Sequence, residues 1–205
     1  SQLDEKKVEY QKNTRLNTQH TLLAPQMAPI QFQFIERAMQ DSGLNIVILN
    51  NNSSEIIDEG LRYVNNDACY PAIIVIGQII HALKSGEYDI DNTTVLMSQT
   101  GGGCRATNYI AFLRKALKSA GFPNVPVVSV SAQGIEDNGF RDQINMKVLH
   151  KLVMGAVYGD LLMKVLLRVR PYETIPGSAN LLYEKWCDKC KDSLKDPNIR
   201  QFRRI

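Results

Sequence analysis

The sequence predicts an α/β fold, in which a parallel sheet of four or slightly more strands carries helices on both faces, as in Rossmann-like and flavodoxin-like proteins. Two observations lead to this prediction. Four short apolar runs alternate with segments whose apolar residues have helical spacing, which is typical of βαβ units with right-handed crossovers. The 205 residues, 44% of them apolar and 22% charged, are enough to bury a core of this kind.

The chain is predicted to open with a polar extension over residues 1–17, which precedes an α/β domain over residues 18–140. Apolar runs at 20–24 and 45–49 predict two buried strands, because turn-forming residues follow each of them. Apolar residues with helical spacing predict helices over 30–42, 55–64 and 70–85.

Two further strands are predicted in the second half of the α/β domain, at residues 93–97 and 126–130. A helix is expected between them, from Cys104 to about Ala120, because Gly121 and Pro123 then stop it. Residues 141–205 are predicted to be a helical C-terminal segment that packs on this domain or on a neighbouring one. Its helices are expected at residues 141–170 and 177–196.

The composition argues against several classes of protein. The formal charge of +3 comes without a dense basic tract, so we expect no nucleic-acid partner. Charged residues interrupt the apolar stretch at 148–169, so we expect no membrane span. No secretory leader is visible, which predicts a cytoplasmic protein whose four cysteines are free thiols or metal ligands.

The loop that follows the third strand has the pattern most suggestive of chemistry. Gly101, Gly102 and Gly103 allow the backbone to approach a bulky group closely, and Cys104 is predicted to lie at a helix N-terminus. The helix dipole and the neighbouring Arg105 would both favour a thiolate, the form of cysteine that binds metals. A tight glycine turn with an incidental thiol is an equally open interpretation.

Nucleotide binding by this loop is not expected. A phosphate-binding loop requires Lys and then Ser or Thr after its last glycine, and Cys-Arg-Ala stands there instead. The consecutive glycines also lack the spacing of a dinucleotide fingerprint.

Cys69 is predicted to lie in a setting similar to that of Cys104, because it precedes Tyr70 and Pro71 at the start of another helix. Two such thiolates could bind one iron–sulfur cluster, although a four-iron cluster usually takes four cysteines and an open site has three. Cys187 and Cys190 could supply further ligands, but they lie within a predicted helix that has no turn between them. Helix packing is the simpler interpretation of that pair.

Two segments resemble a known family. They are Gly60–Ala72, which contains Cys69, and Gln99–Tyr109, which contains Thr-Gly-Gly-Gly-Cys-Arg. They resemble the uncharacterised domain of CoA-substrate-specific enzyme activases, which is related to 2-hydroxyglutaryl-CoA dehydratase subunits. The similarity extends from about Thr18 to Cys190, and includes Val157–Asp160 and Arg170–Glu173.

The resemblance implies a domain of a larger protein in which an ATP-binding activase domain drives a low-potential electron toward an acyl-CoA substrate. Cys69 and Cys104 match cysteine positions of the family, which implies that they bind a four-iron four-sulfur cluster. Arg105 and the glycines at 101–103 would then border the cofactor, and Cys190 is the local candidate for a third ligand. We do not expect the domain to be active alone.

Two other functions remain open at the level of sequence. One is a noncatalytic docking or scaffold domain, in which the long C-terminal helices form the interface and the cysteines bind nothing. The other is a structural zinc site that uses all four cysteines.

Overall fold

A computed structural model describes residues 16–99, 104–130, 139, 142 and 144–196 of the chain. The four described strands form one parallel sheet with the order β2-β1-β3-β4. The strands are β1 Thr21–Pro25, β2 Ile46–Leu49, β3 Thr93–Ser98 and β4 Val127–Val130. The α/β prediction is therefore confirmed, including the parallel direction of all four strands. The polar extension predicted at 1–17 lies mostly outside the described residues.

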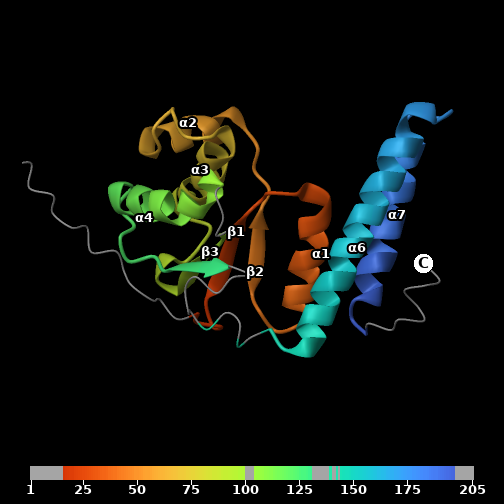
Figure 1. Cartoon of the computed structure of the whole chain (residues 1–205), viewed down its shortest axis with the longest axis horizontal. Coiled ribbons are helices and arrows are strands. Elements are labelled where there is room, and N and C mark those ends of the chain that lie inside the picture. Colours follow the sequence, from red (N-terminus) through yellow and green to blue (C-terminus); the bar gives the residue numbers. More distant parts are fainter. Residues whose placement is uncertain (1–15, 100–103, 131–138, 140–141, 143, 197–205) are drawn as a thin grey trace, which may run out of the picture.

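Helices cover both faces of the sheet (Figure 1). The α-helices are α1 Pro29–Gln40, α2 Ser54–Tyr63, α3 Tyr70–Lys84, α4 Tyr109–Ser119, α6 Met146–Val169 and α7 Ser178–Ser193. Helices α2, α3 and α4 lie on one side of the sheet, whereas α1, α6 and α7 lie on the other. No helix in the described part of the chain has both the length and the apolar character needed to cross a membrane.

The largest core lies between the sheet and the helices α3 and α4. Alternate strand residues such as Leu23, Val95 and Met97 point into it, and Ile76 and Ile80 of α3 meet them with no exposed surface. Because α3 is packed between the sheet and its neighbouring helices, its sequence is apolar on nearly every side. This burial fixes the position of α3, and therefore of the residues at its N-terminus.

The opposite face carries a second layer of helices. Helix α1 packs on β1 and β2, and α6 packs on α1 at two glycines. A methyl group at Gly155 would lie 3.1 Å from Cβ of Phe34, and one at Gly159 would lie 2.9 Å from Cα of Gln31. The small residues at these two positions let α6 approach α1 closely, and α7 then packs on the outer side of this pair.

Two predicted helix starts were wrong by several residues. The helix expected from Cys104 begins with a separate 3-10 turn, η2 Arg105–Asn108, and α4 itself starts at Tyr109. The helix expected over residues 141–170 is interrupted: Asp142 is helical, residues 144 and 145 are not, and α6 begins at Met146. There the Asn145 side chain accepts hydrogen bonds from the backbone N–H groups of Lys147 and Val148 at 3.0 Å each. At α6 a local cap, rather than apolar periodicity, sets the first residue, whereas the Asn108 side chain makes no capping hydrogen bond at the start of α4.

Candidate metal centre

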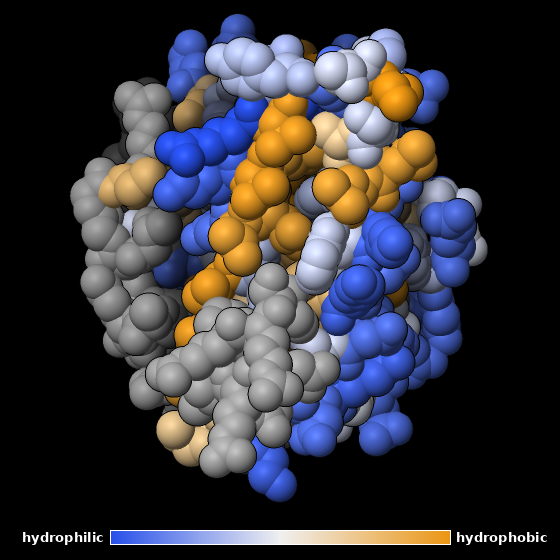
Figure 2. Space-filling view, turned by 90° about the vertical axis from the view of Figure 1, so that its right-hand side faces the viewer, coloured by the Kyte–Doolittle hydropathy of each residue, from blue (hydrophilic) through white to orange (hydrophobic). Residues whose placement is uncertain are grey.

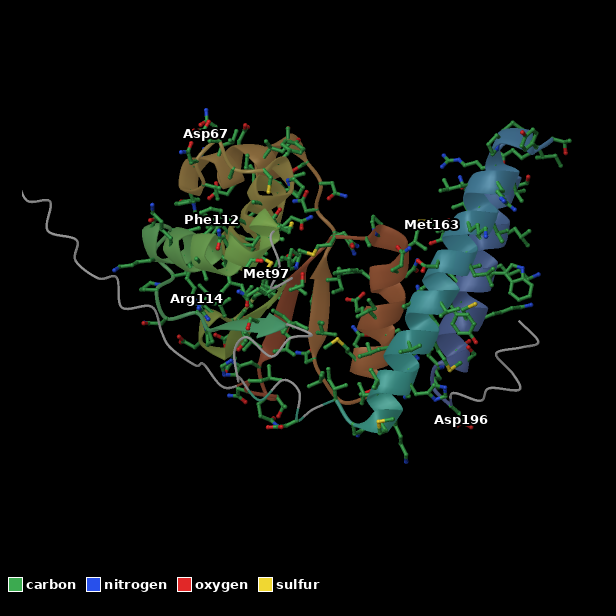
Figure 3. The ribbon with its side chains drawn as sticks, in the orientation of Figure 1. Asp67, Met97, Phe112, Arg114, Met163 and Asp196 are labelled. Atoms are coloured by element: carbon green, nitrogen blue, oxygen red, sulfur yellow. The ribbon has the colours of Figure 1, made fainter. Side chains whose placement is uncertain are left out.

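Cys69 and Cys104 precede different elements, and both influence the same side chain, Tyr109. Cys69 is the residue that precedes α3, and Cys104 precedes η2 in the segment that follows β3. Tyr109 is the first residue of α4 and is 6% exposed. In Figure 3, Asp67 and Phe112 lie on this side of the sheet, whereas Met163 of α6 lies on the other.

The Cys69 thiol is half-buried and is held by a single described side-chain hydrogen bond. Its sulfur lies 2.7 Å from the hydroxyl oxygen of Tyr109, and either group can be the donor. The Cys69 carbonyl oxygen accepts a hydrogen bond from the backbone N–H of Ala72 at 2.9 Å. That bond belongs to the first turn of α3, so the start of the helix fixes the backbone from which the thiol projects.

The Cys104 thiol is exposed, and its sulfur accepts the backbone N–H of Ala106 at 3.5 Å. The backbone N–H of Thr107 in turn donates to the Cys104 carbonyl oxygen at 3.2 Å. The sulfur therefore caps a short 3-10 turn and not α4 itself, so the electrostatic effect of a long helix on this thiol is weaker than the sequence suggested. An exposed sulfur near a backbone donor remains a suitable metal ligand.

The electrostatics of Tyr109 connect the two cysteines. Burial, the hydrogen bond to Cys69 and the negative charge that Cys69 and Cys104 can carry together raise the pKa of Tyr109 to about 12. The phenol therefore keeps its proton at neutral pH and can donate it to a sulfur atom. Cys69 contacts this hydroxyl group directly, whereas Cys104 acts on it only through its charge.

Gln99 adds a polar group beside this site. Its side-chain nitrogen donates to the carbonyl oxygen of Thr107 at 3.0 Å and so ties the end of β3 to η2. Its side-chain oxygen is buried and has no hydrogen-bond partner among the described residues. A buried acceptor of this kind is costly unless a donor or a cation meets it.

Cys190, the predicted third ligand, lies in a different part of the molecule. It is 1% exposed and packs with Cys187 against Phe34, Met154 and Tyr158, between α1, α6 and α7. Burial raises the pKa of Cys190 to about 11 and also raises the pKa of Cys187. The structure therefore does not bring Cys190 to Cys69 and Cys104, and a zinc site that uses all four cysteines has no support in this arrangement.

The remaining predicted site residues are described only in part. Gly101, Gly102 and Gly103 lie outside the described residues, and for Arg105 the structure describes the backbone in η2 but not the side chain. Among the described residues, no group of three or more His, Cys, Asp or Glu side chains could hold a metal ion. Cys69 and Cys104 alone would supply two of the four cysteine ligands that a four-iron cluster usually takes.

Models of known protein families, curated proteins and solved structures were compared with the chain, and none matched. The resemblance to the activase-related domain therefore remains a prediction from the sequence. The functional argument depends on the geometry of the site.

Sequence reasoning selected the two cysteines and also Gln99, as a polar residue that could hydrogen-bond to a cluster or an acyl thioester or could cap a helix, but it gave no role to Tyr109. Tyr109 lies in the segment Gln99–Tyr109 on which the resemblance depends, so its position was visible. Its contact was not, because the hydrogen bond between Tyr109 and Cys69 joins residues that are 40 positions apart. Only the packing of α4 beside the start of α3 brings them together.

Proposed function

We propose that Cys69 and Cys104 are ligands of a cysteine-bound four-iron four-sulfur cluster, in a domain that passes low-potential electrons within a system resembling the 2-hydroxyacyl-CoA dehydratases and their activases. The observation that carries the proposal is the hydrogen bond between the Cys69 thiol and the buried phenol of Tyr109, whose pKa the charge of Cys104 also raises. Thiolate sulfur is the usual protein ligand of iron in such clusters, and nearby hydrogen-bond donors stabilise its charge.

Each group at the site has a part in this proposal. Cys69 and Cys104 would each contribute one sulfur, and a bound cluster would supply the capacity to take up and release one electron. Tyr109 would donate its hydroxyl hydrogen to the Cys69 sulfur and so favour the more negative state of the site. The exposure of Cys104 leaves room for further ligands, which would have to come from outside this pair of residues.

A proposed physiological role follows from the resemblance. An ATP-binding activase domain would deliver the electron, and an acyl-CoA would receive it. The domain described here would then hold the cluster and would not hydrolyse ATP, because its glycine loop lacks the residues of a phosphate-binding loop.

Anaerobic reconstitution tests the cluster proposal. The protein is incubated with ferrous iron, sulfide and excess 2-mercaptoethanol, because an added thiol can complete a ligand set that the chain fills only in part. Bound iron and acid-labile sulfide are then measured together with visible and electron paramagnetic resonance spectra. We expect a cluster in the wild-type protein and a loss of most of it in Cys69→Ser and in Cys104→Ser.

The matched control is Cys190→Ala, which removes a thiol from the core between α1, α6 and α7. If this variant remains folded and retains iron and sulfide at the wild-type level, the cluster belongs to the pair at Tyr109. Equal cluster content in the double variant Cys69→Ser, Cys104→Ser would contradict the proposal.

A further inference from the structure

An apolar ridge runs along the outer face of α6 and has no cover among the described residues. Within the described part of the chain, twelve of the seventeen exposed large apolar residues lie between Met146 and Leu182. Figure 2 shows an orange stripe along the face formed by α6 and α7. The ridge consists of residues spaced four apart, which are between 44% and 54% exposed: Leu149, Val153, Val157, Leu161 and Val165.

The spacing of the ridge indicates what kind of surface it fits. Residues four apart on a helix advance by about 40° around its axis at each step, so the ridge winds across the exposed side of α6. A flat lipid surface would contact only part of such a row. The i+4 row of another helix would interlock with the whole of it, in the commonest class of helix packing.

A groove beside the C-terminal half of the ridge extends the apolar surface onto α7. It encloses about 100 Å³ and is lined by Leu162, Val165 and Val169 of α6, together with Leu182 and Trp186 of α7. Val165 belongs to both the ridge and the groove. A helix that crosses α6 along the ridge could therefore insert a large apolar side chain between α6 and α7.

The charges around the ridge select the partner. Helix α6 carries four lysine or arginine residues and a single acidic one, Asp160, whose Oδ1 accepts a hydrogen bond from Gln31 of α1 at 2.8 Å. Lys164 and Arg168 are exposed and lie three residues beyond Leu161 and Val165, so they border the ridge on the helix surface. An occupant with acidic residues at its polar edge would complement them.

The same charges argue against a second copy of this chain as the occupant. In an antiparallel pair of α6 helices centred on Val157, Lys164 and Arg168 of one copy would lie near Lys147 and Lys151 of the other. Such a contact places like charges together around the apolar contact, which is unfavourable.

We propose that the ridge formed by Leu149, Val153, Val157, Leu161 and Val165 is the docking site for an acidic amphipathic α-helix of a partner protein. Its apolar face packs along the ridge, and its acidic residues face Lys164 and Arg168. The ridge lies on the side of the sheet away from Tyr109, so the proposal is independent of the cluster at Cys69 and Cys104.

The test uses two synthetic helical peptides with the same leucine spacing, one with glutamate and one with lysine at all other exposed positions. Binding is measured by fluorescence anisotropy, and circular dichroism verifies the fold of each protein variant. We expect the acidic peptide to bind at least tenfold more tightly than the basic one. The double variant Val157→Glu, Leu161→Glu should abolish binding, and the double variant Lys164→Glu, Arg168→Glu should reverse the preference between the peptides.

The matched control is Leu61→Glu on α2, since Leu61 is 44% exposed and lies away from the ridge. It should bind the acidic peptide as the wild-type protein does. Three results would overturn the proposal: equal binding of both peptides, binding of phosphatidylglycerol vesicles but of neither peptide, or a concentration-dependent dimer that the Val157→Glu, Leu161→Glu variant abolishes. The second result would indicate a lipid surface and the third a second copy of the chain.

Discussion

At the level of single residues, the contact between Tyr109 and Cys69 gives the site a testable electrostatic property. The pKa of Tyr109 is raised to about 12, so its hydroxyl group remains protonated and can donate to a thiolate. We expect Tyr109→Phe to slow the alkylation of Cys69 by roughly three- to tenfold at neutral pH, because a hydrogen bond to a charged group is worth about 1 kcal/mol or more. Iodoacetamide labelling followed by peptide mass analysis measures this rate for each cysteine.

Tyr88→Phe serves as the control for that experiment, since Tyr88 is half-buried elsewhere in the same core and burial also raises its pKa. An unchanged alkylation rate of Cys69 in Tyr109→Phe would mean that the thiol donates to the phenol and that the phenol does not stabilise the thiolate.

The residues of the site were predictable only in part, for a physical reason. Cys69 and Cys104 each lie in a recognisable local pattern. Cys69 precedes a helix start that contains a proline, and Cys104 follows a run of three glycines. The position of Cys190 depends on how α7 packs against α1 and α6, and no local pattern encodes that packing. Tyr109 was missed because its partner is distant in the sequence.

At the level of helices and strands, the contact between α2 and α3 depends on glycine. A methyl group on Gly77 of α3 would overlap the carbonyl oxygen of Ile56 in α2, and backbone atoms cannot rotate away as a side chain can. We expect Gly77→Ala to lower the free energy of unfolding by about 2 kcal/mol, even after the gain in helix propensity. Urea unfolding followed by circular dichroism measures the difference.

Gly155→Ala provides a graded comparison for this prediction. Its new methyl group would meet Cβ of Phe34 at 3.1 Å, which small shifts between α1 and α6 can relieve. We therefore expect a smaller loss of stability, within about 1 kcal/mol of zero. If Gly77→Ala proved no more destabilising than Gly155→Ala, the close approach of α2 and α3 would be disproved.

The start of α7 is capped by a carboxylate from the preceding loop. The two oxygens of Glu173 accept the backbone N–H groups of Gly177 at 2.8 Å and Ala179 at 2.9 Å, and these bonds lower the pKa of the Glu173 carboxyl group. Because the folded pKa is below the unfolded one, the stabilisation is present above the unfolded pKa and is lost as the pH falls through the folded one.

We expect Glu173→Gln to be less stable than the wild-type protein at neutral pH. A glutamine amide has one acceptor oxygen and no charge, so it cannot replace both hydrogen bonds that the carboxylate accepts. The difference should shrink as the pH is lowered from about 7 to about 3, because the wild-type carboxylate becomes protonated over that range. Urea unfolding at a series of pH values tests this, and a difference independent of pH would show that the charge of Glu173 has no part in the cap.

The order of helices and strands was predictable because each strand is a short apolar run and each helix has the matching periodicity. The exact start of α6 was not, because Asn145 caps it through two hydrogen bonds that apolar spacing does not reveal. The start of α4 was obscured for a different reason, since the 3-10 turn before it has no distinctive pattern of its own.

On the scale of the whole molecule, the four cysteines divide into two pairs on opposite sides of the sheet. Cys69 is half-buried and Cys104 is exposed, whereas Cys187 and Cys190 are buried between α1, α6 and α7. The reactivity of the first pair therefore depends on the proposed cluster site. The reactivity of the second pair depends on the packing of the helices that carry the ridge.

This division predicts two separate classes of thiol reactivity. Cys69 and Cys104 should react with iodoacetamide in the native protein, and moderate urea should change their rates little. Cys187 and Cys190 should be protected, because burial both blocks access and raises their pKa values, that of Cys190 to about 11. Their rates should rise with urea in proportion to the fraction of unfolded protein, if α6 and α7 open only with the whole domain. If the buried pair reacts faster in dilute urea than the unfolded fraction predicts, α7 separates from α1 and α6 while the sheet remains folded.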